Sequence, residues 1–155
     1  MQILQIVVFL CSLYLGNMAR QRKSWVEKRY LNRQPEVKVL QKAFADIPAG
    51  ATMLIPTPQM VQEYLEHLAT GQQGSLSQMR ADLAASNGVQ FTCPVTSGIF
   101  LRIVAEAAYE EFTLGKPLAE IAPFWRLING KSPTAKKLSF GVEFLLNQRR
   151  AEGLL

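Results

Sequence analysis

Residues 97–126, SGIFLRIVAEAAYEEFTLGKPLAEIAPFWR, carry the pattern that decides the expected fold. In its first part, apolar residues recur at four-residue spacing, at Ile99, Ile103 and Ala107. This spacing predicts a helix with one broad apolar face, and it places Arg102 and Glu106 on the opposite side. We expect this helix to begin near Ser97 and to run to about Phe112.

The segment that follows, residues 123–128 (PFWRLI), is short, apolar and rich in aromatic side chains. The turn dipeptide Asn129-Gly130 comes directly after it, so we expect a buried strand that leads into a surface turn. A last amphipathic helix is predicted from about Gly141 to Arg150, with Arg149 beside Arg150 near its end.

Two further helices are predicted upstream from their terminal residues. The pair Thr57-Pro58 favours a helix start, because threonine can cap the helix and proline suits its first position. A second helix begins at Ser75 or Ser77 and ends at Asn87-Gly88. Together with the helix at residue 97 it predicts a helix-turn-helix, although the connection is longer than the compact turn of the standard motif.

These segments carry a resemblance to a known family. Residues 123–128 resemble the Pro-Cys-His-Arg-Val active-site motif of the alkylguanine-DNA alkyltransferases, and residues 102–104 (RIV) resemble the Arg-Ala-Val that opens the family's recognition helix. Residues 138–142 (LSFGV) are similar to the Tyr-Ser-Gly-Gly-Leu stretch, and residues 152–153 to the closing Glu-Gly. Residues 74–79 (GSLSQM) are similar to Val-Ser-Tyr-Gly-Glu-Leu, so the family's order of motifs is kept.

The resemblance implies a mainly α fold, in which residues 51–155 form a winged helix-turn-helix-like domain with a short strand or wing, preceded by an N-terminal extension. It also implies that Arg102 enters DNA and occupies the place of an extruded base. The alternative for Arg102 is an exposed side chain paired with Glu106 one turn on. Basic residues around the Asn-Gly turn can form a wing that contacts phosphates. Besides Arg102, the residues expected to contact DNA are Ser75, Arg126, Lys131, Lys136, Lys137 and Ser139.

The family's reaction is a suicidal alkyl transfer, which needs a cysteine thiolate activated by a histidine and oriented by a glutamate. Here Phe124 stands in the place of the cysteine and Trp125 in that of the histidine, so no catalytic residue is predicted. Either Phe124 stacks on an extruded base, or it fills a pocket that has closed. The base pocket implied by the resemblance comprises Phe124, Trp125, Gly141 and Glu152.

Family members without the acceptor cysteine, the alkyltransferase-like proteins, bind alkylated guanine in DNA and hand it to excision repair. The resemblance therefore implies a non-catalytic DNA-repair protein. Its partners would be double-stranded DNA, with an alkylated or otherwise extrudable base, and an excision-repair protein. Two alternatives stay open: an alkyltransferase that uses Cys93 as a relocated acceptor, and a protein-interaction module that has lost DNA binding. The simpler interpretation of Cys93 is a buried structural residue, because its neighbourhood supplies no base.

Composition agrees with several of these expectations. The chain has 17 Lys and Arg residues against 12 Asp and Glu, a formal charge of +5 that permits nucleic-acid binding but equally fits an ordinary solubilising surface. Glycine-rich phosphate loops, a nucleophile elbow and His/Cys ligand spacings are missing from the sequence, so no cofactor and no metal are predicted. Two cysteines without a disulfide framework suit a reducing compartment, and we expect a cytoplasmic protein.

The N-terminal region divides into two parts before the short strand or extended connection expected at residues 51–56. Residues 1–17 are an apolar leader, which fits an export signal, a membrane anchor or a mis-assigned start. The apolar run is shorter than the roughly 20 residues that span a bilayer. We favour translation from Met18, which predicts no membrane contact. Residues 18–50 form a basic arm that either lies along phosphates, with its aromatics stacking, or is a partly ordered extension.

Overall fold

The computed structural model describes residues 22–30 and 32–155. The predicted leader, residues 1–17, and the proposed start at Met18 lie outside the described residues. What is described is mainly helical, with one small three-stranded sheet. Among these residues, no helix combines the length and the apolar character needed to cross a membrane.

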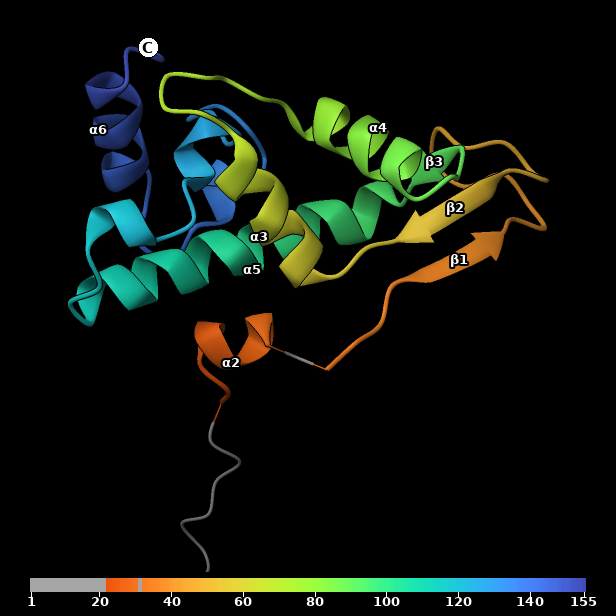
Figure 1. The fold of residues 1–155 in the computed structure, drawn as a ribbon, viewed down its shortest axis with the longest axis horizontal. Helices are drawn as coiled ribbons and strands as arrows, with labels where there is room; N and C mark the ends of the chain where they lie inside the picture. Colours follow the sequence, from red (N-terminus) through yellow and green to blue (C-terminus); the bar gives the residue numbers. More distant parts are fainter. Residues whose placement is uncertain (1–21, 31) are drawn as a thin grey trace, which may run out of the picture.

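The helix α5 (Pro94–Thr113) runs through the middle of the molecule (Figure 1). It begins three residues before the expected Ser97, because Pro94 occupies a first-turn position where its missing N–H costs nothing. The helices α3 (Pro58–His67) and α4 (Leu76–Ser86) pack on one side of it, and the short helix α2 (Trp25–Arg29) lies on another (Figure 1).

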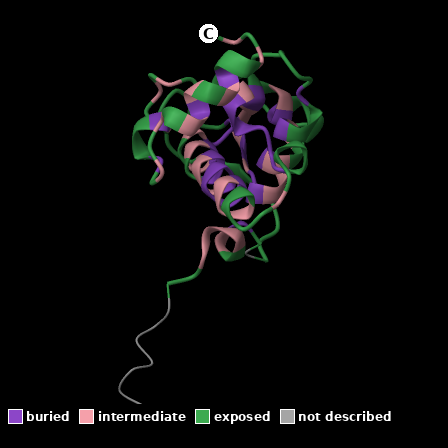
Figure 2. Ribbon diagram, turned by 90° about the vertical axis from the view of Figure 1, so that its left-hand side faces the viewer, coloured by how far each residue is buried: buried purple, intermediate pink, exposed green. Residues whose placement is uncertain are grey.

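Two expectations about the faces of α5 are wrong. Ile99, expected on the apolar face, is 50% exposed, whereas Leu101 and Ala105 are buried in the core. Glu106, expected on the polar side, is only 2% exposed. The helix is covered by neighbours over much of its circumference, so the pattern of apolar residues alone misplaces its buried face. Figure 2 shows the buried residues gathered in the middle of the molecule.

The sheet has the order β1-β2-β3 and lies at the end of the molecule opposite the helix α6 (Glu143–Ala151) (Figure 1). The strand β1 (Glu36–Val39) is antiparallel to β2 (Thr52–Ile55), and β3 (Phe91–Thr92) is parallel to β2. The strand expected at residues 51–56 is therefore confirmed. Residues 36–39, from the segment interpreted as a basic arm, form the edge of this sheet.

The predicted helix start at Thr57 is confirmed, and of the two starts predicted for the next helix, Ser75 and Ser77, the structure has Ser75. Each of Thr57 and Ser75 accepts a hydrogen bond from a backbone N–H three residues on. Asn87 ends α4 as expected. The strand expected at residues 123–128 is not formed, and a 3₁₀ turn, η2 (Phe124–Arg126), takes its place. Residues 118–120 and 135–137 form the similar turns η1 (Leu118–Glu120) and η3 (Ala135–Lys137).

Candidate nucleic-acid interface

A cavity of about 710 Å³ opens beside the first half of α5. Its volume lies within the range of roughly 300–1,000 Å³ that small-molecule sites occupy. Its walls come from the start of α4, from the loop after η2 and from α2, and most of them are apolar. Residues that line it include Ser75, Leu76, Ile99, Arg102, Leu127 and Lys137. Among the described residues that line it there is no carboxylate, so its charged groups are cations.

Arg102 stands at this cavity with its side chain 35% exposed. Its Nε lies 3.5 Å from Glu106 Oε1, so the predicted pairing with Glu106 is present. That Nε is buried and has no hydrogen-bond partner among the described residues. The centre of the guanidinium also lies 5.3 Å from the ring centroid of Trp25. Arg102 is therefore held by Glu106 and Trp25, and only the exposed part of its side chain is open to a ligand.

The three glutamates of α5 are turned to partners elsewhere in the fold. Glu106 accepts hydrogen bonds from the backbone N–H of Ser139, at 2.7 Å, and from its hydroxyl. Glu110 accepts one from the Val26 N–H at 2.8 Å. Glu111 pairs with Arg29 at 2.6 Å. The hydrogen bond from Arg29 lowers the pKa of Glu111, so its carboxylate stays ionised beneath α2. Glu110 and Glu111 are therefore committed to α2, whereas Glu106 stays beside Arg102.

The residues expected to contact DNA fall into two groups. Lys131, Lys136 and Lys137 are exposed on the loop before α6, and Lys137 also lines the cavity. Ser75 is exposed at the start of α4, where its hydroxyl accepts the Gln78 N–H. Of these residues, Ser75 and Lys137 share the cavity with Arg102.

Ser139 and Arg126 are less free. Ser139 is exposed but its hydroxyl and N–H are given to Glu106. The side chain of Arg126 is only 14% exposed and pairs with Glu152 at 2.9 Å. It also donates to the carbonyl of Leu68 at 2.6 Å and to the hydroxyl of Thr70. With its donors committed inside the fold, Arg126 does not form part of the exposed basic surface.

The four residues of the implied base pocket do not meet at the Arg102 cavity. Phe124 is completely buried, against Phe140 and Phe144 at centroid distances of 5.9 and 6.0 Å. Stacking on an extruded base needs an exposed ring face, so the geometry favours the alternative in which Phe124 fills a closed pocket. Gly141 has φ +75°, which favours glycine, and it marks the turn before α6.

Trp125 and Glu152 belong to a separate polar junction between η2 and α6. The Trp125 Nε1–H donates to Glu152 at 2.8 Å, and both residues line a second cavity of about 560 Å³. Burial alone would raise the pKa of Glu152. Hydrogen bonds from Arg126, from the Gly71 N–H and from Trp125 outweigh it, and the pKa falls to about 2. Glu152 is consequently a structural anion that holds η2.

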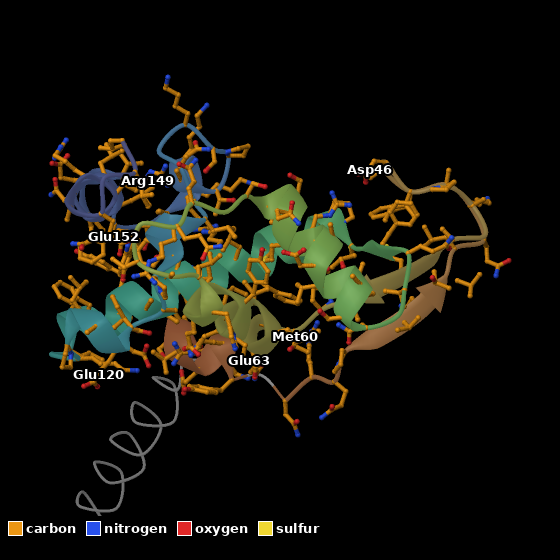
Figure 3. All side chains as sticks on the ribbon, turned by 45° about the horizontal axis from the view of Figure 1, so that its top comes forward. Asp46, Met60, Glu63, Glu120, Arg149 and Glu152 are labelled. Carbon is orange, nitrogen blue, oxygen red and sulfur yellow. The ribbon has the colours of Figure 1, made fainter. Side chains whose placement is uncertain are left out.

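Arg149 supports the same junction, a role that its place near the helix end did not predict. It is 3% exposed and donates to the backbone carbonyls of Trp125 and Ile128, at 2.7 and 3.3 Å, and of Leu154. Burial lowers its pKa. Figure 3 shows Arg149 and Glu152 near each other at the α6 end, far from Asp46 at the sheet end. The segment after α5 is thus fixed by the buried cation of Arg149 and the partly buried anion of Glu152.

Cys93 lies at the start of α5 and is 5% exposed, packed with Ile47, Ala51 and Met53. The single histidine of the chain, His67, is exposed at the end of α3 and contacts its own helix through the Glu63 carbonyl. The Cys93 thiol is therefore not exposed in the way that a cysteine accepting an alkyl group would need to be. Among the described residues, no group of three His, Cys, Asp or Glu side chains is placed to hold a metal ion.

Comparisons with protein-family models, with curated proteins and with solved structures each gave no match. What the cavity binds must therefore follow from its own residues. It combines an apolar interior, two cations and an exposed helix start, and it faces a loop that carries further lysines. These residues suit a ligand that has an apolar part and a negative charge.

Proposed function

We propose that this protein is a non-catalytic DNA-binding protein that recognises an alkylated or otherwise extrudable base. In this proposal α4 and α5 act as a winged helix-turn-helix-like unit, and the loop of residues 129–137 serves as the wing. The observation that carries the proposal is the position of Arg102. It is a partly exposed cation at an apolar cavity whose described lining residues include no carboxylate.

The surface of α5 beside Arg102 supports a close approach of DNA. Val95 and Ile99 are 52% and 50% exposed, and Gly98 lies between them. A Cβ at Gly98 would meet nothing within 4 Å, so the packing of the protein does not require glycine there. Glycine inside a helix costs about 1 kcal/mol relative to alanine. A residue that costs stability without an internal reason fits a helix whose surface another molecule must approach closely.

Binding then follows from the positions of the charges. The exposed lysines at 131, 136 and 137 contact phosphates on one side of the cavity and place the duplex over α5. Arg102 enters the stack as a base leaves it, and the apolar cavity receives that base. Extrusion costs a few kcal/mol, and least for a damaged or mispaired base. Selectivity for a lesion arises from this difference.

The test is fluorescence anisotropy of the full chain with a labelled duplex that contains one O⁶-alkylguanine, beside its undamaged twin. We expect tighter binding to the damaged duplex, and we expect Arg102→Ala to remove this preference. Arg150→Ala is the matched control, since it removes the same charge from an exposed position on α6. Binding that Arg150→Ala and Arg102→Ala weaken equally would leave no special role for Arg102.

Salt dependence gives a second readout of the same proposal. The logarithm of the affinity should fall with the logarithm of salt concentration, with a slope of about −0.9 for each phosphate contacted. If the three loop lysines each contact a phosphate, replacing Lys137 with alanine should reduce the magnitude of the slope by about 0.9, the value for one phosphate. A slope that the substitution does not change would place the phosphates elsewhere.

A protein-interaction module is the second candidate, because Val95 and Ile99 present apolar surface that a protein partner could cover. Absence of DNA binding at low salt would favour it. The buried Cys93 gives the third candidate, alkyl transfer, no such support. A protein that binds an alkylated base but has no cysteine to accept the alkyl group cannot repair the lesion itself, so we expect an excision-repair protein as partner. We expect the protein to act in the cytoplasm.

A further inference from the structure

The helix α2 is fixed to α5 by several polar contacts. Arg29 is 1% exposed and donates to both carboxylate oxygens of Glu111, at 2.9 and 2.6 Å. The Val26 N–H donates to Glu110, and a capping box between Ser24 and Glu27 closes the start of the helix. A helix of five residues is unstable alone, so these contacts hold it in place.

This anchoring places Trp25 at the Arg102 cavity. Val26 and Arg29 face the second half of α5, while the indole of Trp25 forms part of the cavity wall. Two cations lie against that ring: Lys28 Nζ is 3.9 Å from its centroid and the Arg102 guanidinium 5.3 Å. Figure 1 shows α2 alongside α5.

Among the described residues that line the cavity, Trp25 alone is aromatic. Phe124, the aromatic residue expected at a base pocket, is completely buried, and Trp125 is 4% exposed with its Nε1–H given to Glu152. A nucleobase gains about 1–3 kcal/mol from stacking on an aromatic side chain, and no other ring at this cavity offers that contact. Trp25 is half-buried, with part of its surface open to solvent.

We infer that Trp25 is the stacking residue of this cavity: its indole stacks on the nucleobase that enters, while Lys28 faces the adjoining phosphate. This inference rests on the proposed function and adds a binding residue from outside residues 51–155. Both cations lie over the indole, so a base stacks on it where Arg102, the more distant of the two, leaves the ring to enter the duplex. The ligand class is a base of a DNA strand.

The first experiment compares Trp25→Leu, which keeps apolar bulk, with Trp25→Phe, which keeps a ring. Binding of the full chain to the alkylguanine duplex is measured by anisotropy, with the undamaged twin beside it. Loss of one stacked base should weaken binding of Trp25→Leu to the damaged duplex by about 5- to 150-fold. Trp25→Phe should recover most of this loss, and the undamaged duplex should be affected less.

The outcomes separate this inference from the proposed function. If the unchanged protein prefers the damaged duplex and Trp25→Leu binds it within twofold of the unchanged protein, the inference fails and the function stands. Equal weakening on both duplexes also overturns it, because stacking on an extruded base must favour the damaged one. If the unchanged protein binds neither duplex, both fail.

A second measurement avoids mutation, in case Trp25→Leu releases α2. Acrylamide quenches exposed tryptophan, and Trp125 is buried, so quenching of the unchanged protein reports mainly on Trp25. Saturation with the alkylguanine duplex should lower the quenching constant at least twofold, whereas the undamaged duplex should lower it less. A quenching constant unchanged by the damaged duplex would overturn the inference.

Discussion

Replacing Glu152 with glutamine removes one negative charge from the junction of η2 and α6 and leaves the shape of the side chain almost unchanged. Every contact of the carboxylate is with a donor. Oε1 accepts from Trp125 Nε1 and from Arg126, and Oε2 accepts from the Gly71 N–H and from Arg126. Whichever way the new amide turns, its NH₂ group faces one of these donors, and Arg126 loses its counter-charge.

The magnitude follows from the pKa of Glu152. Its side chain is 11% exposed, and its pKa falls from 4.5 to about 2 on folding. Such a difference corresponds to about 3 kcal/mol of stability at neutral pH. For a chain of 155 residues, this loss should lower Tm by about 6–12 °C.

The pH dependence has a fixed sign. Because the folded-state pKa is depressed, the contribution of Glu152 is complete above the unfolded value of 4.5 and is lost as pH falls towards about 2. The difference between the unchanged protein and Glu152→Gln should therefore be largest at pH 7. It should shrink by about 1.4 kcal/mol at pH 3.5, one pH unit below the unfolded value.

Urea unfolding followed by tryptophan emission measures the free energy of unfolding at both pH values. Glu120→Gln is the control, because it removes the same charge from an exposed position that lines the same cavity as Glu152. A loss below about 1 kcal/mol at pH 7 would contradict the network described for Glu152. So would a difference that stays constant down to pH 3.5.

Two further predictions concern residues at the starts of helices. Iodoacetamide should leave Cys93 unmodified in the folded protein and label it once urea has unfolded the chain, since Cys93 is 5% exposed. Rapid labelling of the folded protein, measured by mass spectrometry, would instead support Cys93 as a relocated alkyl acceptor. Ser75→Ala should lower the free energy of unfolding by about 1 kcal/mol through loss of the α4 cap, whereas Ser77→Ala, two residues further on, should lower it less. Equal losses in urea unfolding would mean that Ser75 is not the cap.

Local signals in the sequence predicted the start of α3 and both ends of α4. Thr57, Ser75 and Asn87 act through backbone groups within four residues, so the information needed to place them lies in the segment itself. The short strand at residues 51–56 was also predictable from its apolar pattern and the turn before it. In each case the physical cause is close along the chain.

Longer-range contacts explain two of the errors in the central region, the missing strand and the buried Glu106. Residues 124–126 form a 3₁₀ turn in place of a strand, where buried Arg149 binds the carbonyls of Trp125 and Ile128. The spacing of apolar residues cannot show whether a short apolar segment of this kind forms a strand or a helical turn. The buried position of Glu106 depends on the N–H and hydroxyl of Ser139, 33 residues away, which satisfy a carboxylate that burial would otherwise penalise.

The sequence by itself determined the helix boundaries near Thr57 and Ser75, the basic balance of charge, and the absence of a cysteine at position 124. Only the tertiary structure decided that Phe124 is closed off and that Trp25 and Arg102 share one cavity. The reason is physical: a cap is a bond between near neighbours in the chain, whereas burial and cation–ring contacts depend on segments that only folding brings together.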